Sequence, residues 1–450
     1  MKHYEQRFPG GIHPTDGSDK ALTKAVPIQT FVPDVIELSM SQSGGSICEP
    51  LVAVGDHVER GQLVGQPKNF TAVRLHASVS GTVKEIRVEK KGTMEVPLLV
   101  IEPDKEQPAE PKMEYQREWM DIRKYSRNQL ISLMEEGGIT GMGGAGFPAH
   151  VKYKTDKPIE YILINACECE SYLTCDHRMM MEHGMAILNG VNLLVKAGGA
   201  KKAYICTEDN KQSCADYLTR LIGEQEVPIE VKVFPVKYPE GGERQLIQAA
   251  TGKELVAGGL PADAGIIVSN VQTAKAMADM VFGGIPCITR CITVTGLVRK
   301  PGNFLVPLGT PLRELLKRCG GLSELDNKVI LGGPMTGTCI GVQIKCDQIP
   351  QSVTKVSGGL IVLKNDGYEE SPCIRCGSCM KACPAGLTPW KIDFAIRQGK
   401  VDLCHQLYAT ECISCGCCSY VCPAKRELSQ NTVKARNDVR VMLRERGKTS

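Results

Sequence analysis

The pattern of hydrophobic and polar positions changes period along the chain. Residues 1–110 show short apolar runs broken by Gly and Asp at hairpin spacing, without a sustained helical period, which predicts a β domain. Residues 117–285 alternate short apolar runs, such as 160–165, with amphipathic stretches, such as 180–196. Because strands that alternate with helices build parallel sheets, this segment predicts an α/β domain with helices on the faces of its sheet. A linker rich in Pro and charge separates the two domains at 103–116.

The last third of the chain contains two more units. Within residues 286–365, a hairpin pattern at 292–307 precedes an amphipathic helix that ends at 320–321 and a further strand at 328–335. This order predicts a small α+β domain similar to a β-grasp. Residues 366–450 hold a block of cysteines and a charged C-terminal helix. The predicted fold class is therefore multidomain α/β plus β, with a β-sandwich, an α/β domain, a β-grasp-like domain and a cysteine-rich domain in that order.

The composition of the chain excludes several classes of protein. Hydrophobic residues make up 42% of the 450 positions, which is enough for sizeable cores and excludes a wholly disordered chain. The net charge of +4 excludes a nucleic-acid binder that works through bulk electrostatics. No apolar run approaches the roughly 18 residues that a membrane helix needs, and no apolar leader follows the first Met. We therefore expect a soluble protein of a reducing compartment.

The cysteines carry the strongest signal, because ten of the 21 lie between Cys373 and Cys422. Two runs there repeat the pattern C-x2-C-x2-C-x3-C-P, which is the spacing of bacterial two-cluster ferredoxins. In such ferredoxins the fourth Cys of each run binds the cluster of the other run. The residues predicted to hold the first [4Fe–4S] cluster are Cys373, Cys376, Cys379 and Cys422. Those predicted to hold the second are Cys412, Cys415, Cys418 and Cys383.

Zinc is the alternative for closely spaced cysteines. Structural zinc sites use two C-x2-C pairs with a longer gap between them and no third Cys in register. Two full copies that both end in Pro therefore favour iron–sulfur clusters. Cys404 and Cys417 lie outside the repeated pattern, and we expect them to be bystanders.

A glycine-rich segment at 138–153 is the second motif. Gly141, Gly143 and Gly146 satisfy G-x-G-x-x-G, but the motif follows a predicted helix, so it is not the usual dinucleotide fingerprint. A cluster of glycines nevertheless lets backbone N–H groups approach a phosphate or a flat ring. Lys152 could add a counter-charge for a phosphate. A simple glycine-rich turn is the alternative.

Polar residues follow the predicted strands of the α/β domain. Asn165, Glu168 and Glu170 come directly after the strand at 160–165, and further polar groups follow at 238–243 and 269–273. Open α/β sheets bind ligands at the carboxyl ends of their strands, so these groups are candidates to contact a flavin, a ribose or a nicotinamide amide. The cysteines between them have the spacing C-x-C-x5-C, which fits no common metal site, and buried thiols are the simpler interpretation.

Taken together, the motifs resemble one family. GMGGAGFPAHVKY, NACECESYLTCDHR, YPEGGERQLI and SNVQTA resemble, in that order, the FMN- and NADH-binding elements of the flavoprotein subunit of respiratory complex I. With FPGGIHP near the start, a β domain before the flavin region and twin ferredoxin motifs at the end, nearly all 450 residues resemble the RnfC family. That family supplies the electron-input component of the Rnf complex, an ion-translocating ferredoxin:NAD⁺ oxidoreductase.

The resemblance implies FMN, NAD(H) and two [4Fe–4S] clusters as cofactors, and it assigns roles position by position. The residues matched to the flavin phosphate and ring loop are Gly141, Gly143, Gly144, Gly146 and Lys152. Those matched to other flavin contacts are Asn165, Glu168, Asn270 and Thr273. Phe147 matches a residue that stacks near nicotinamide, and Glu170 and Glu243 match acidic residues near the NADH ribose or carboxamide. The chain departs from the complex I pattern at Cys167, where that family has Asp, and at Tyr172 and Leu173, where it has Pro-Gly.

Two segments have less definite roles. The stretch at 51–86 resembles the small domain that carries biotin or lipoate, but Phe70 stands where the modified Lys would be, so we expect a docking or packing module. The basic helix at 425–450 is most simply a solvated face. Docking to an acidic protein or an anionic membrane is its alternative.

The resemblance implies hydride exchange between NAD(H) and FMN and single-electron exchange between FMN and the clusters, without a catalytic side chain. The implied partners are other subunits of a membrane redox complex, including membrane-spanning ones, and ferredoxin indirectly, with the chain peripheral on the cytoplasmic side. A soluble NADH-dependent cobalamin reductase is one alternative, although its glycine-rich motif lies close to the N-terminus. A non-enzymatic iron–sulfur relay scaffold is another. The lack of an Arg cluster at the expected ribose site favours NADH over NADPH.

Overall fold

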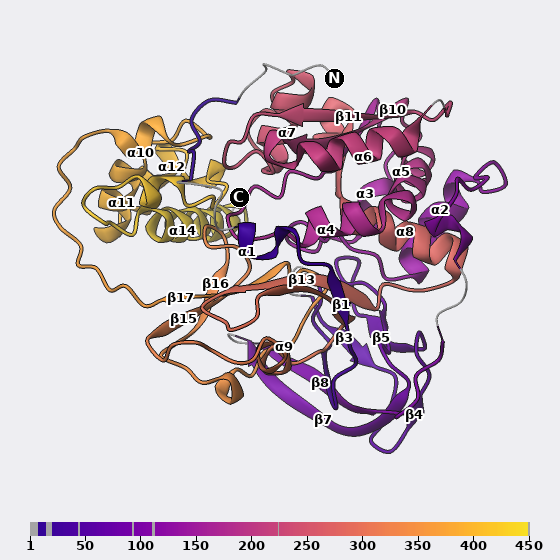
Figure 1. Ribbon diagram of the computed structural model, residues 1–450. Coiled ribbons are helices and arrows are strands. Elements are labelled where there is room, and N and C mark those ends of the chain that lie inside the picture. Colours follow the sequence, from indigo (N-terminus) through magenta and orange to yellow (C-terminus); the bar gives the residue numbers. More distant parts are fainter. Residues whose placement is uncertain are drawn as a thin grey trace.

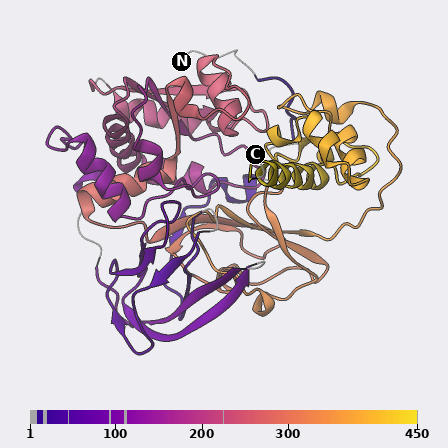
Figure 2. The ribbon, with the colours of Figure 1, turned by 180° about the vertical axis from the view of Figure 1, so that it is seen from behind.

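The computed structural model describes residues 8–14, 20–43, 46–91, 94–109, 113–223 and 225–448. Four units pack around one another (Figure 1). The α/β unit lies at the top of that view, the N-terminal β unit and a mixed sheet lie below it, and the cysteine-rich unit lies at one side. The view from behind in Figure 2 shows the same arrangement.

The N-terminal β unit is a sandwich of two antiparallel sheets, as the strand pattern predicts. One sheet has the order β2 (Ile36–Ser39), β8 (Met94–Pro103), β7 (Gly81–Lys91) and β4 (His57–Val58). The other has the order β3 (Cys48–Pro50), β5 (Leu63–Pro67) and β6 (Leu75–His76). Their inward side chains form one core that also takes in Leu308 from the mixed-sheet unit. Phe70 lies between β5 and β6 and is 73% exposed.

The α/β unit is built on four parallel strands in the order β11 (Ile229–Phe234), β10 (Lys202–Glu208), β9 (Tyr161–Asn165) and β12 (Ile266–Asn270). The strand order along the chain reverses between β9 and β12. Asn165 and Asn270, the last residues of these two strands, are register partners. In open parallel sheets the crevice beyond such a reversal is where ligands bind, so the sheet itself places the site at Asn165 and Asn270.

Helices lie on both faces of this sheet. Those that pack directly on it are α5 (Gly184–Gly198), α6 (Gln212–Ile222), α7 (Glu243–Thr251) and α8 (Val271–Gly283). The helices α2 (Arg127–Glu136), α3 (Ala149–Tyr153) and α4 (Cys175–Glu182) complete the unit. Ile162 and Ile164 point to the face covered by α5 and α8, whereas Leu163 points to the face covered by α7. The prediction of a single helix at 180–196 is wrong. It is two helices that break at His183, and Gly184 after the break lies close to the ring of Tyr217.

The third sheet has the order β1 (Ile28–Thr30), β14 (Gly302–Pro307), β13 (Thr289–Gly296), β17 (Gly359–Lys364), β15 (Asn327–Leu331) and β16 (Thr338–Val342). The hairpin of β13 and β14, the helix α9 (Leu312–Arg318) and the parallel pairing of β13 with β17 give a β-grasp-like arrangement. Its edge strand β1 follows α1 (Ala21–Lys24) and comes from the N-terminal region of the chain. Residues 20–30 therefore belong to this sheet in space.

The cysteine-rich unit repeats one local structure. Its helices are α10 (Ser378–Lys381), α11 (Pro389–Arg397), α12 (Val401–Gln406), α13 (Cys417–Tyr420) and α14 (Leu428–Lys448). Arg375 and Ser414 have φ values of 56° and 60°, and Gly377 and Gly416 have 77° and 78°, immediately before α10 and α13. The two cysteine runs thus follow the same backbone path, as their identical spacing predicts.

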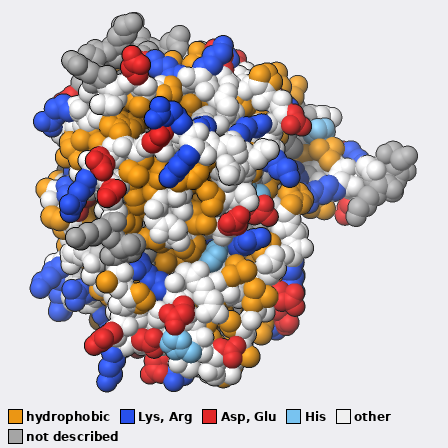
Figure 3. All heavy atoms as spheres, turned by 90° about the vertical axis from the view of Figure 1, so that its right-hand side faces the viewer, with side chains coloured by type: hydrophobic (Ala, Val, Ile, Leu, Met, Phe, Trp, Pro, Cys, Tyr) orange, Lys and Arg blue, Asp and Glu red, His pale blue; other side chains and the backbone are white. Residues whose placement is uncertain are grey.

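Charges are mixed on the face drawn in Figure 3, where Lys and Arg side chains are interspersed with Asp and Glu around a band of hydrophobic ones. Such a face has no field of a single sign to attract a nucleic acid. Among the described residues, no helix is long and apolar enough to cross a membrane.

The contact between α5 and α8 provides a test of the packing. A Cβ added at Gly190 in α5 would lie 1.8 Å from the carbonyl oxygen of Ala274 in α8. We expect Gly190→Ala to lower the free energy of unfolding by about 1–3 kcal/mol, because the helices would have to separate. Gly367→Ala is the matched control, since its Cβ would meet no atom, and it should change stability by less than about 0.5 kcal/mol. Equal midpoints of chemical denaturation for the two variants would contradict this packing.

Candidate functional site

The glycine-rich loop lies between α2 and α3, and hydrogen bonds within the loop and from α8 fix its shape. The N–H of Gly141 donates to the carbonyl of Phe147 at 2.9 Å, which closes the loop. Thr273 on α8 accepts from the N–H of Met142 at 3.0 Å and donates to the carbonyl of Thr140 at 3.0 Å. Thr273, expected to contact a ligand, therefore supports the loop from the helix and does not line the cleft described below.

The middle of this loop is open toward solvent. Within the part of the chain that the structure describes, the N–H groups of residues 143–145 have no hydrogen-bond partner. A Cβ at Gly144 would meet nothing within 4 Å. Gly146 differs, because a Cβ there would lie 2.8 Å from Val356 of the mixed-sheet unit. Gly144 thus leaves room for a ligand, whereas Gly146 permits the close packing of two units.

Two asparagines shape the carboxyl end of the sheet. The Asn165 side chain donates to the carbonyl of Gly241 at 2.8 Å. Asn270 caps α8 by accepting from the N–H of Gln272 at 2.9 Å, and it donates to Asp176 at 2.8 Å. Both amides hold the loops that surround the crevice.

Glu168 and Glu170 are both engaged with backbone groups. Glu168 accepts from the N–H groups of Asp176 at 2.8 Å and His177 at 3.3 Å, at the start of α4. Glu170 accepts from the N–H groups of Met335 at 3.0 Å and Thr336 at 2.9 Å, which ties this loop to the mixed-sheet unit. Burial raises the pKa of both carboxyls. Each still lines the inner cleft, but neither carboxylate is free to reach far into it.

Lys152 and Glu243 lie at the outer side of the crevice. The Lys152 ammonium donates to the carbonyl of Val268 at 2.9 Å and lies 3.3 Å from Glu243. Phe147, 41% exposed, lines the same outer space. A cation, a carboxylate and an aromatic ring therefore line the same outer space of the crevice.

Two connected clefts run through this region. The outer cleft has a volume of about 720 Å³ and the inner one about 780 Å³, and both are lined by Gly143, Gly144, Asn165, Glu243 and Asn270. The predicted residues that line one or both are Gly141, Gly143, Gly144, Phe147, Lys152, Asn165, Glu168, Glu170, Glu243 and Asn270. Gly146 and Thr273 line neither.

The inner cleft ends at the second cysteine run. Residues 413–415 form part of its wall, and the Tyr238 hydroxyl donates to the carbonyl of Cys415 at 2.8 Å. Gly416 packs against Met335, where a Cβ would lie 3.0 Å from the carbonyl oxygen. The cysteine loop is thus in contact with both the α/β unit and the mixed-sheet unit.

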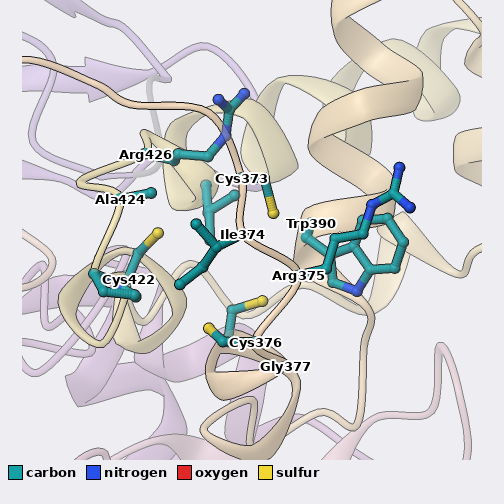
Figure 4. A pocket seen from close by; sticks show the side chains of 12 residues that line it. Cys373, Ile374, Arg375, Cys376, Gly377, Trp390, Cys422, Ala424 and Arg426 are labelled. Atoms are coloured by element: carbon teal, nitrogen blue, oxygen red, sulfur yellow. The ribbon is translucent and has the colours of Figure 1, made fainter.

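The cysteines gather as two sets of four. Cys373, Cys376, Cys379 and Cys422 line one cavity, in which the sulfur atoms of the labelled residues face a common space (Figure 4). Cys383, Cys412, Cys415 and Cys418 line another. In each set the fourth Cys of one run lies with the first three of the other run. Cys404 is buried in the core between α11, α12 and α14, whereas Cys417 lies at the edge of the second cavity.

Sequence reasoning missed two contributors. Lys20 donates to the carbonyls of Glu168, Glu170 and Leu173 at 2.8, 2.8 and 2.6 Å, and so holds the loop after β9. Arg290 lines the inner cleft, and its buried Nη1 has no partner among the described residues. Neither residue belongs to a motif, because both lie outside the α/β unit and reach the site only through the tertiary fold.

The residues present fit a flavin nucleotide and two cubic clusters. Free N–H groups at 143–145, the open side of Gly144 and the unpaired guanidinium nitrogen of Arg290 suit a phosphate and a polar ring. Four thiols around each of two cavities are the donor set that an iron–sulfur cluster requires.

Comparison with known families agrees with this fit. Residues 134–279 match the Nuo51 FMN-binding domain, 6–106 the RnfC barrel sandwich hybrid domain, 291–338 the SLBB domain and 372–425 the 4Fe-4S dicluster domain. The chain is therefore an electron-transfer flavoprotein with FMN and iron–sulfur clusters as cofactors.

Relatives that match most of the chain identify its family more narrowly than the domain families do. The chain is 37% identical over 390 residues to a subunit of the proton-translocating ferredoxin:NAD(+) oxidoreductase complex of Clostridium ljungdahlii, covering 85% of this chain and 82% of that one. It is 37% identical over 440 residues to a subunit of the Na(+)-translocating ferredoxin:NAD(+) oxidoreductase complex of Acetobacterium woodii, covering 96% and 97%. The chain belongs to the RnfC family, and the resemblance inferred from its motifs is confirmed.

Among solved structures, the NAD+-reducing [NiFe]-hydrogenase in the H2-reduced state is similar with a TM-score of 0.48 and 17% identity. That match covers 70% of this chain and 61% of the hydrogenase chain. The similarity is too low to add to what the relatives show.

Gly144 offers a direct test of the flavin site. Since its Cβ position is open, Gly144→Val should fold normally but fill the space that the ligand needs. We expect FMN affinity to fall by about tenfold or more, or about 1.4 kcal/mol, in a flavin fluorescence titration. The melting temperature of the flavin-free protein should stay unchanged. Wild-type FMN affinity in this variant would place the flavin elsewhere.

Proposed function

We propose that the chain carries electrons between NAD(H) and its two [4Fe–4S] clusters through FMN, as one component of an ion-translocating ferredoxin:NAD⁺ oxidoreductase complex. The observation that carries the proposal is the inner cleft, which extends from Gly143 and Gly144 to Cys415. A nucleotide site and a cluster site that share one cleft suit transfer between the two.

Each part of the cleft has a separate task in this proposal. The loop at 143–145 and Lys152 hold the flavin phosphate and ring, with Asn165 and Asn270 at the ring edge. The outer cleft, with Phe147 and Glu243, receives the nicotinamide nucleotide. A bound flavin accepts two electrons as hydride and releases them singly. The side chains need only orient the two rings and exclude water, and no acid or base is required.

The two cysteine sets have an order relative to the cleft. The set of Cys383, Cys412, Cys415 and Cys418 adjoins the inner cleft, and we call it the proximal set. The set of Cys373, Cys376, Cys379 and Cys422 is the distal set, and Cys373 and Cys376 are exposed. Beside them Ile374 is 67% exposed and Arg375 is also exposed. The distal set therefore suits exchange with an external electron carrier.

Partners follow from the family. The relatives are named as subunits of ion-translocating complexes, so we propose that membrane-spanning subunits supply the ion path and that this chain is peripheral to them. Ferredoxin would reach it indirectly, through another subunit. Attachment at the cytoplasmic side of the membrane is part of the same proposal.

Cysteine variants test the order of transfer. Cys418→Ser should lose the proximal cluster, and Cys373→Ser the distal one, each leaving about half of the iron. After anaerobic mixing with NADH, freeze-quench EPR should show rapid reduction of the proximal cluster in Cys373→Ser. In Cys418→Ser, reduction of the distal cluster should slow by about 100-fold while the flavin is still reduced, because the electron must cross a longer gap.

Cys339→Ser is the control for these variants, because Cys339 is exposed and lies outside both sets. It should behave as the unaltered protein does. Rapid reduction of the distal cluster in Cys418→Ser would overturn the proposed order. A flavin that NADH does not reduce in any variant would overturn the proposed function and favour a relay scaffold.

A further inference from the structure

The segment FPGGIHP has no role in the site described so far, yet residues 8–12 lie between the α/β unit and the cysteine-rich unit. Ile12 pairs with Tyr238 through two backbone hydrogen bonds, of 2.8 and 2.9 Å. One residue earlier, the N–H of Gly11 donates to the carbonyl of Ala382 at 3.0 Å. Adjacent residues of this segment therefore bond to two different units.

The backbone path of the segment requires glycine at both positions. Gly10 has a φ of +64°, and a Cβ there would lie 2.6 Å from the carbonyl oxygen of Cys383. Gly11 has a φ of +78°, and a Cβ there would lie 2.7 Å from the carbonyl oxygen of Tyr238. Side chains rarely adopt this backbone conformation, and the space for them is already filled. The backbone of the segment thus passes within contact distance of both units.

Buried side chains anchor the segment at its two ends. Phe8 is 1% exposed, and the Lys237 ammonium donates to its carbonyl at 2.7 Å and lies 4.2 Å from the centre of its ring. Ile12 packs with Tyr238, Ala382 and Cys417 in one apolar cluster. The segment is therefore a fixed part of the interface.

Its contacts lie on both sides of the proximal cysteine set. Cys383, beneath Gly10, is the only member of that set from the first cysteine run. Tyr238, paired with Ile12, donates to the carbonyl of Cys415, a member from the second run. The covalent connection to this unit is extended, because residues 365–372, which lead to Cys373, form no helix or strand and run around its edge (Figure 1). Non-covalent contacts must therefore set the position of the unit.

We propose that residues 8–12 act as a positioning clamp that holds the proximal cysteine set at a fixed distance from the inner cleft. This inference rests on the proposed function. The clamp governs electron transfer from the flavin to the clusters, a step that forms no covalent bond. NADH would supply two electrons to bound FMN with uptake of one proton, and the clusters would then receive these electrons singly, with two protons released to water. A displaced unit would lengthen the gap for the second stage only.

Gly10→Ala tests the clamp, and Ile12→Ala is a second variant that removes apolar contact without backbone strain. Gly399→Ala is the matched control, because Gly399 has a φ of +69° in the same unit but its Cβ would meet nothing within 4 Å. Each reconstituted full-length protein is mixed anaerobically with NADH in a stopped-flow spectrometer. Flavin bleaching and cluster reduction are followed separately, and iron and flavin contents are measured.

We expect both clamp variants to keep their iron, their flavin and the wild-type rate of flavin bleaching. Cluster reduction should slow by about tenfold or more, because electron transfer slows steeply as the gap between flavin and cluster lengthens. Gly399→Ala should match the wild type in both stages. Wild-type cluster reduction in both clamp variants would overturn the inference, and so would loss of iron or an equal slowing of both stages. Clusters of the unaltered protein that dithionite reduces but NADH does not would overturn the proposed function itself.

Discussion

The site depends on one partly buried cation. Lys20 donates to three backbone carbonyls of the loop that follows β9, at Glu168, Glu170 and Leu173. An ammonium group has three donors, so all of them are satisfied and the cost of burying the charge is offset. Burial nevertheless lowers the pKa of Lys20. Because these carbonyls converge on one point, the loop has a defined shape, and Glu168 can cap α4 while Glu170 reaches the mixed-sheet unit.

A second lysine ammonium group, which also donates to backbone carbonyls, joins other units. Lys355 is buried and donates to the carbonyls of Gly138 at 2.6 Å and Arg74 at 3.2 Å, so a side chain of the mixed-sheet unit binds the backbone of the α/β unit and of the sandwich. These lysines fix the loop after β9 and the start of the glycine-rich segment, and the hydrogen bond from Tyr238 to the carbonyl of Cys415 joins the proximal cysteine set to the same cleft. Their relative positions therefore follow from side-chain and backbone contacts between units.

Local patterns predicted much of this arrangement. The β/α alternation predicted the parallel sheet, because each strand and helix buries its own apolar face, and the repeated cysteine spacing predicted two identical loops. The glycine-rich loop and the strand ends at Asn165 and Asn270 were also found from sequence. The engagement of Glu170 by residues 335–336, the supporting role of Thr273 and the part played by Lys20 were not, since they depend on contacts between segments far apart in the chain. The break at His183 was missed although Glu182, His183 and Gly184 interrupt the apolar pattern there.

A single chain joins hydride chemistry to one-electron chemistry. An anaerobic titration of the reconstituted protein with NADH tests it most directly, with flavin absorbance and cluster EPR followed on the same samples. We predict that the flavin bleaches and that signals of reduced [4Fe–4S] clusters rise with the same added equivalents. A flavin that stays oxidised, or clusters that only dithionite reduces, would contradict the account.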